Sequence, residues 1–132
     1  MRSRIHTYNL TVQEADLDEL MHVNNVVYFS YLQAAAIEHW YSTVAAEISD
    51  SLRWIVKKHE IEYFKPAFLH DSLTVKTWIE AFGGVSSVRS YEIHREQDLI
   101  VRAQTQWIAV DPQSMKPKRL DISTLDSYFF EE

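Results

Sequence analysis

The chain of 132 residues contains no cysteine, so disulfides, thiolate metal sites and a cysteine nucleophile are excluded. It has only two glycines and three prolines, and because flexible linkers are usually rich in such residues, long linkers are not expected. No stretch approaches the roughly 18 apolar residues of a membrane-spanning helix, and the first residues carry charges without an apolar segment behind them. We therefore expect a cytoplasmic protein with no signal peptide and no membrane span.

Charge and size narrow the function further. The formal net charge is −6, whereas a nucleic-acid binder normally presents a basic surface, so no nucleic-acid partner is expected. A local cluster of lysine or arginine can still hold phosphate groups on an acidic protein. The histidines lack the spacing of metal ligands, which predicts no metal site. The length suits a single domain spanning residues 1–132.

Alternating apolar and polar residues predict five β-strands. We expect these strands at residues 5–12, 54–64, 72–80, 85–95 and 99–110. A helix is predicted at residues 26–41, where aliphatic or aromatic side chains cover almost every face, a composition typical of a helix buried inside a protein. We interpret residues 42–52 as a weaker continuation or a loop, and residues 120–132 as a short terminal helix.

The order is therefore one strand, one long buried helix and four strands joined by short turns. Short connections favour antiparallel neighbours in a sheet. The sequence thus predicts the α+β class, with a five-stranded antiparallel sheet wrapped around a long central helix.

Residues suited to chemistry concentrate in the segment just before the helix. This segment holds two carboxylates, a histidine and two amides, at Asp16, Asp18, His22, Asn24 and Asn25. Taken alone, it is typical of a solvated acidic loop whose asparagines cap the helix.

A resemblance to a known family is carried by the pattern Asp16-x-Asp18-x-x-x-His22-Val23-Asn24-Asn25-x-x-Tyr28. It resembles the signature of hotdog-fold acyl-CoA thioesterases, the 4-hydroxybenzoyl-CoA thioesterase family and related acyl-acyl carrier protein thioesterases. Residues 63–66, 71–75 and 99–105 resemble these proteins more weakly. The resemblance implies the hotdog fold, hydrolysis of an acyl-CoA or acyl carrier protein thioester, and assembly into a homodimer or homotetramer. It implies no cofactor, since CoA is part of the substrate.

The resemblance also implies roles within the segment. Asp18 would be the catalytic carboxylate, either as the nucleophile or as the base that activates a water, and Asp16 would support the loop. Backbone N–H groups at Val26, Val27 and Tyr28 would bind the carbonyl oxygen, because a helix N-terminus favours developing negative charge. The chemistry fits the composition: with no cysteine and no serine in a nucleophile-elbow sequence, a carboxylate is the candidate base or nucleophile.

Other candidates carry more than one interpretation. His22 would polarise the carbonyl or the water, or else order the loop by hydrogen bonds. Asn25 would position the water or the thioester, or else cap the helix. Asn24 is a candidate substrate-binding residue in the same turn before the helix. Phe64 is a candidate for the acyl channel, or else an ordinary aromatic residue of the core. Lys65 and Arg89 are candidates for the CoA phosphates, or else ordinary surface charges. Among these, Arg89 is favoured because the nucleotide of relatives lies on the surface near such a strand residue.

The chain also departs from the family pattern. Met21 stands where a glycine usually precedes the histidine, and Gln33 and Ala36 stand where relatives often carry glutamate and arginine. Loss of the glycine keeps a second hypothesis open, a non-catalytic hotdog module that binds an acyl thioester. A hotdog hydratase or dehydratase is a third. Acyl chain length, aromatic or aliphatic preference, and CoA or carrier protein as the thiol stay open at this point.

Overall fold

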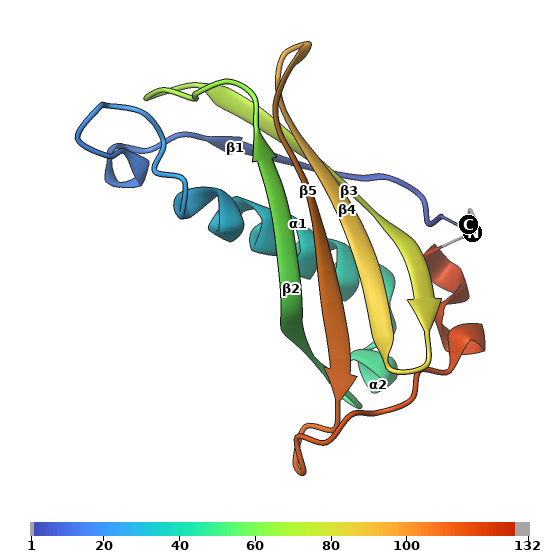
Figure 1. Cartoon of the computed structure of the whole chain (residues 1–132). Coiled ribbons are helices and arrows are strands. Elements are labelled where there is room, and N and C mark those ends of the chain that lie inside the picture. Colours follow the sequence, from blue (N-terminus) through green and yellow to red (C-terminus); the bar gives the residue numbers. More distant parts are fainter. Residues whose placement is uncertain (1, 129–132) are drawn as a thin grey trace.

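The structure is a computed structural model and describes residues 2–128. One antiparallel sheet runs through the molecule, with the strand order β1-β3-β4-β5-β2. Its strands are β1 (His6–Thr11), β2 (Arg53–Tyr63), β3 (Ser72–Gly83), β4 (Ser86–Arg95) and β5 (Asp98–Val110). Figure 1 shows the sheet curling along one long helix, α1 (Val27–Thr43). The predicted α+β class and the five-stranded antiparallel sheet around a central helix are confirmed.

Short turns join the last three strands, as expected for antiparallel neighbours. Between β3 and β4 the chain turns at Gly84, whose φ of 58° suits a residue without a Cβ. Between β4 and β5 it turns at Glu96, whose φ is 56°, so this turn lies slightly earlier than the predicted one. Strand β3 also continues past the predicted end and reaches Gly83.

Helix α1 is buried on one face only. Its buried residues recur every three or four positions, at Tyr28, Tyr31, Leu32, Ala35, Ala36, His39 and Trp40, which is the spacing of a single helix face. On the opposite face Ile37 and Tyr41 are 53% and 57% exposed. The prediction of a helix enclosed on nearly every side is therefore wrong for the single chain, because the sheet covers one face and no described element covers the other.

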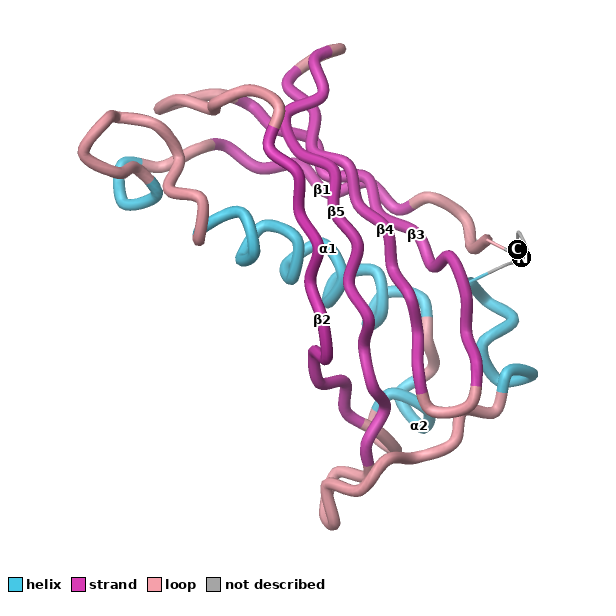
Figure 2. The backbone as a smooth tube through the Cα atoms, in the orientation of Figure 1, coloured by secondary structure: helices cyan, strands magenta, loops and turns pink. Residues whose placement is uncertain are grey.

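The core has two parts, one along each half of α1. The N-terminal half packs with Val75, Tyr91 and Ile93 of the central strands. The C-terminal half packs with Leu52, Ile79 and Tyr128 among others. Figure 2 shows the helix lying across one face of the sheet, so both parts are sandwiched between the same two layers.

Two short helices follow α1 along the described chain. Residues 42–52 contain a single helical turn, α2 (Ala46–Ser49), and a 3-10 helix follows at Ile122–Tyr128. Leu125 and Tyr128 of this second helix are buried in the core, so the terminal helix is confirmed for its described part, while residues 129–132 lie outside the described residues. Within residues 2–128, no helix has the length and apolar character that crossing a bilayer requires.

Candidate active site

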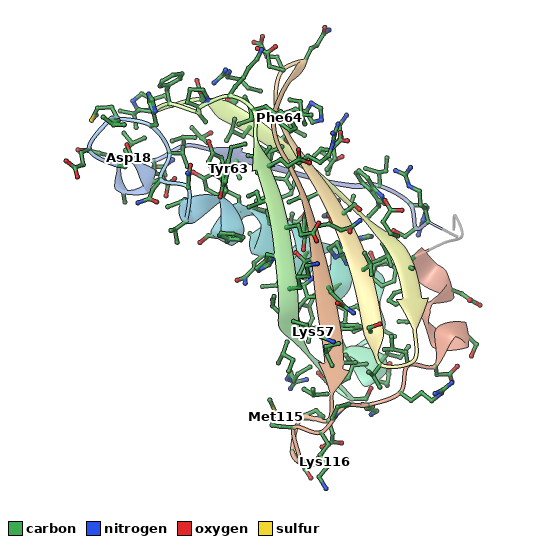
Figure 3. All side chains as sticks on the ribbon, viewed as in Figure 1. Asp18, Lys57, Tyr63, Phe64, Met115 and Lys116 are labelled. Carbon is green, nitrogen blue, oxygen red and sulfur yellow. The ribbon has the colours of Figure 1, made fainter. Side chains whose placement is uncertain are left out.

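The candidate site is the loop that leads from β1 into α1. A 3-10 turn at Glu14–Asp16 begins the loop, and an antiparallel bridge between Leu17 and Val23 closes it. Asp18 lies inside this closed loop, and Figure 3 places its side chain at the same end of the sheet as Tyr63 and Phe64. The loop thus presents its polar residues beside the N-terminus of α1.

Asp16 anchors the loop to the helix. Its Oδ2 atom accepts a hydrogen bond from the hydroxyl of Tyr31 at 2.8 Å and another from the backbone N–H of Gln13 at 3.0 Å. Its backbone carbonyl accepts from the N–H of Asn24 at 2.9 Å. Burial, and then the hydrogen bond to Asp16, raise the pKa of Tyr31. The protonated Tyr31 hydroxyl therefore stays a donor to the carboxylate throughout the neutral range, in the supporting arrangement that the resemblance implied for Asp16.

Asp18 organises the turn around itself. Its Oδ1 atom accepts from the backbone N–H of Leu20 at 2.9 Å and of His22 at 3.3 Å. Its own N–H donates to the carbonyl of His22 at 2.8 Å, and its carbonyl accepts from the N–H of Met21 at 3.0 Å. No hydrogen bond of Oδ2 to another described residue is formed. One carboxylate oxygen therefore fixes the side chain while the other is available to a water or a substrate.

Met21 adopts the backbone conformation that the family's glycine would supply. Its φ is 64°, in the left-handed region that costs an L-residue roughly 1–2 kcal/mol. Its side chain is 58% exposed, so the methionine is accommodated without filling the core. The loop therefore places a residue with a side chain in a conformation that glycine adopts without strain.

The predicted oxyanion donors at the start of α1 differ in their availability. The side chain of Asn24 accepts from the N–H of Val26 at 3.0 Å, and the backbone carbonyl of Asn24 accepts from the N–H of Val27 at 2.8 Å. The N–H of Tyr28 has no acceptor among the described residues. Asn24 therefore occupies the N–H groups of Val26, the residue that caps the helix, and of Val27, and Tyr28 provides the first backbone N–H of the helix that is left for a ligand.

His22 and Asn25 lie on either side of this turn. The ring of His22 packs edge-on against Phe68, with ring centroids 5.2 Å apart, and its backbone bridges to the same residue. These contacts order the loop, which is one of the two roles considered for His22. Asn25 is exposed, and its carbonyl accepts from the hydroxyl of Tyr63 at 3.2 Å. The two residues are brought close to Asp18 and to the helix N-terminus, respectively.

Phe64 and Lys65 follow directly after β2, at this same end of the sheet. Phe64 is 47% exposed, with the guanidinium of Arg102 5.6 Å from its ring centroid. Lys65 forms an exposed ion pair with Asp98 at 3.1 Å. An exposed pair of this kind is worth little in water, so the Lys65 ammonium is accessible to an anionic group.

Arg89 lies far from the position expected for it. It is 4% exposed and sits on the face of β4 that is covered by α1, so it cannot be the surface contact for a nucleotide that the resemblance implied. Alternation along β4 places it on the same face as the buried Tyr91 and Ile93. The structure therefore separates Arg89 from the other candidates.

Sequence reasoning missed two tyrosines that shape the site. Tyr31 holds Asp16 from a position 15 residues along the chain, and no local pattern reports such a contact. Tyr63 donates to Asn25 and packs on Tyr28 with centroids 5.6 Å apart. Its place in the segment 63–66, which resembles the family, was the available signal. No cluster of three metal-ligating side chains occurs within residues 2–128.

Solved structures with the same fold identify the architecture. A structure described as the 1,4-dihydroxy-2-naphthoyl-CoA thioesterase Slr0204 from Synechocystis superposes with a TM-score of 0.81 at 22% identity, covering 95% of this chain and 96% of the other. The YbaW probable thioesterase from Escherichia coli gives a TM-score of 0.82 at 22% identity, covering 95% and 99%. The fold is that of the hotdog thioesterases.

The sequence comparison places the chain within that class. Residues 3–128 match the family described as the acyl-ACP thioesterase N-terminal domain. Because this match spans nearly the whole sequence, the chain belongs to that family and is a thioester hydrolase by class. The acyl-CoA thioester hydrolase YbgC from Shigella flexneri is 26% identical over 132 residues, covering 97% of this chain and 98% of the relative.

Proposed function

We propose that the protein hydrolyses acyl-CoA thioesters to the free acid and CoA, with Asp18 as the catalytic carboxylate. The observation that supports this most is a half-buried aspartate, with one oxygen fixed and the other available, in the loop that leads into the N-terminus of α1, where the N–H of Tyr28 has no acceptor among the described residues. The relative YbgC is described as an acyl-CoA thioester hydrolase. The description of this relative favours CoA over a carrier protein as the thiol.

In this mechanism the thioester carbonyl lies against the first turn of α1. The N–H of Tyr28 donates to the carbonyl oxygen, and the positive end of the helix dipole stabilises the negative charge that develops there. His22 and Asn25 serve as positioning residues, His22 by holding the turn around Asp18 and Asn25 by facing the bound thioester. A single oxyanion donor of this type is worth on the order of 10²–10³-fold in rate.

Asp18 has two chemical routes to the same products. As a base, it takes a proton from a water that attacks the carbonyl, and the carbon–sulfur bond breaks as CoA leaves with a proton. As a nucleophile, its oxygen attacks the carbonyl, CoA leaves, and water then hydrolyses the resulting mixed anhydride. A single turnover in ¹⁸O-labelled water separates the two, since label in the Asp18 carboxylate indicates the covalent route.

The surroundings of the site suggest where the rest of the substrate binds. Phe64 and Lys65 lie at the same end of the sheet as Asp18, and Lys65 is a candidate contact for a CoA phosphate. The acyl group then extends along α1 toward its C-terminal half. We further propose that the enzyme needs no cofactor, acts in the cytoplasm and works as a homodimer or homotetramer.

A panel of acyl-CoAs, assayed with a thiol-reactive dye, tests the proposed function. We expect release of free CoA from at least one member, with the acid as the second product. Tight binding without release would instead indicate a binding module, and loss of enoyl-CoA absorbance in the ultraviolet would indicate a hydratase. Either of those outcomes would overturn the proposal.

A further inference from the structure

A cavity of about 450 Å³ lies between the C-terminal half of α1, the beginning of β2 and the inner face of the sheet. This volume is typical of a site for a small organic ligand. Apolar side chains form most of its wall, including Trp40, Trp54, Ile79, Phe82 and Trp107. Neither Asp18 nor the first turn of α1 lines it. The cavity is therefore a second binding region along the helix that carries the candidate active site.

Arg89 brings a positive charge into this apolar cavity. It lines the cavity although it is 4% exposed, and arginine stays protonated in proteins. Its Nη1 atom donates to Nδ1 of His39 at 2.9 Å and to Oγ1 of Thr77 at 3.1 Å. Because arginine can only donate, Nδ1 of His39 accepts and its proton lies on Nε2, so His39 is neutral. Both partners of Arg89 are therefore uncharged.

No carboxylate neutralises Arg89 within the part of the chain that the structure describes. The five ion pairs there involve other cations, and the groups that act electrostatically on Arg89 are tyrosines. Buried charges in proteins are normally paired, because removing an ion from water without a counter-ion is costly. Among residues 2–128, the cation in the cavity therefore has no counter-ion.

Tyr128 is a second, independent indication of a missing partner. The side chain lines the same cavity and is fully buried. Its hydroxyl oxygen interacts with Arg89, but arginine can only donate, so the O–H proton of Tyr128 has no acceptor among the described residues. Buried hydroxyls without a partner are rare in folded proteins. Arg89 and Tyr128 together offer N–H and O–H donors to one acceptor group in the cavity.

We propose that the cavity binds an acyl group whose far end is a carboxylate, with that carboxylate held by Arg89 and Tyr128. Apolar walls suit the methylene chain, and a carboxylate supplies both the negative charge and the acceptor oxygens that the two donors lack. This inference rests on the proposed function, and it assigns the enzyme a preference for thioesters of dicarboxylic acids. The helix rise of 1.5 Å per residue puts Ala36 and Trp40 about 12 and 18 Å from Tyr28. Because carbon–carbon bonds are about 1.5 Å long, the acyl chain must have roughly ten or more carbons.

Binding can be measured without any hydrolysis. Three tryptophans line the cavity, so their fluorescence reports its occupation by octanoate or by the neutral octan-1-ol. We expect octanoate to bind about 10-fold or more tightly than octanol, the size of a hydrogen bond to a charged group. Arg89→Met should remove this preference, and Tyr128→Phe should reduce it while leaving octanol binding unchanged. The Asp18→Asn variant should bind both probes as the wild type does.

Activity provides a second measurement. The wild type should show a kcat/KM about 10-fold or more higher for dodecanedioyl-CoA, which ends in a carboxylate, than for dodecanoyl-CoA. Arg89→Met should reverse this ratio, and the Tyr128→Phe variant, which keeps the ring in the core, should lower it. Equal binding of octanoate and octanol by the wild type would overturn the inference. Loss of all hydrolysis with the octanoate preference intact would instead overturn the proposed function alone.

Discussion

At the scale of single residues, Asp16 and Asp18 show how two similar carboxylates are given different tasks. Asp16 is tied by its Oδ2 atom to Tyr31 of the helix and to Gln13 of the loop. Asp18 is held only by backbone N–H groups of its own turn, through Oδ1. Asp16 is therefore a structural anchor, whereas Asp18 is held in a fixed orientation by Oδ1 and keeps Oδ2 available for a water or a substrate.

Replacing Tyr31 by phenylalanine should loosen this anchor. The variant loses the hydroxyl that donates to Asp16 at 2.8 Å while it keeps the buried ring. A hydrogen bond to a charged group contributes about 1.5–3 kcal/mol, so the free energy of unfolding should fall by about that amount in urea titrations. Tyr41→Phe is the matched control, because Tyr41 lies on the same helix but is 57% exposed. Equal effects of the two substitutions would contradict the anchoring role.

His39 should make the stability of the protein depend on pH. Burial and then the charge of Arg89 lower its pKa to about 2, with further contributions from His6 and Arg4, and the ring of Tyr128 packs against it. Below the ordinary pKa near 6.5 the unfolded chain binds a proton that the folded chain does not. The stability supplied by neutral His39 is therefore complete above about pH 6.5 and declines as the pH falls.

From pH 7 to pH 5, this histidine should account for a loss of about 2 kcal/mol in the free energy of unfolding. The His39→Gln variant should lose that part of the pH dependence in denaturant titrations at both pH values. His70→Asn is the control, since His70 is exposed and has a positive φ that asparagine tolerates. An unchanged slope in His39→Gln would show that His39 does not stay neutral in the fold.

At the scale of elements, the loop between β1 and α1 determines where Asp18 lies. Its closure depends on the bridge between Leu17 and Val23 and on the left-handed conformation of Met21. Because the loop is stabilised by several hydrogen bonds of its own backbone, it tolerates a residue with a side chain where a glycine would fit without strain.

Met21→Gly should therefore stabilise the protein. Removing the Cβ relieves roughly 1–2 kcal/mol of backbone strain in the folded state. Glycine also has more conformational freedom in the unfolded chain, which lowers the free energy of unfolding by about 0.5–1 kcal/mol and offsets part of this gain. We expect a net gain of up to about 1 kcal/mol in the free energy of unfolding, with thioesterase activity retained. Met21→Ala keeps the Cβ and should show no such gain. A glycine variant no more stable than the alanine variant would argue against strain at this position.

Much of the element order could be predicted because it depends on local periodicity. Strand β5 alternates cleanly and was placed within one residue of its observed start at Asp98. The same alternation in β4 also put Arg89 on the face of Tyr91 and Ile93, so its burial could have been read from the sequence. The resemblance led instead to a surface position. Contacts such as Tyr31 to Asp16 could not be predicted, since they depend on how the helix docks rather than on sequence spacing.

The composition of α1 misled the prediction of burial for a different reason. An apolar side chain favours burial, but the sequence does not show whether the same chain or another molecule covers it. The sheet of the same chain covers Leu32 and Ala35, whereas Ile37 and Tyr41 face outward. Sequence periodicity therefore identified the helix and its apolar character, and only the three-dimensional structure separated its two faces.

At the scale of the whole molecule, the outward face of α1 continues onto the edge of the sheet. Among the described strands β2 pairs with β5 alone, so no described strand covers its other edge. Ile55 and Val56 of this strand are exposed beside Ile37 and Tyr41 of the helix. An open strand edge next to apolar side chains is a surface that proteins usually cover, and a second copy of the chain is the occupant we propose.

The double variant Ile37→Lys and Ile55→Lys should therefore dissociate the oligomer. Sedimentation velocity should show a dimer or larger assembly for the wild type and a monomer for the variant, because the added charges would be buried without partners in the interface. Ile5→Lys is the matched control: Ile5 is 55% exposed and directly precedes β1, which forms the opposite edge of the sheet from β2. A monomeric wild type would remove the basis for this prediction.

The most direct test of the account is the rate of CoA release by Asp18→Asn, compared with Glu19→Gln and the wild type. Glu19 is the neighbouring exposed carboxylate in the same loop, so both variants remove one negative charge from one segment. We predict that Asp18→Asn lowers kcat by at least about 10²-fold without lowering the free energy of unfolding by more than about 1 kcal/mol, while Glu19→Gln stays near the wild-type rate. Full activity of Asp18→Asn would contradict the central claim that this carboxylate performs the chemistry.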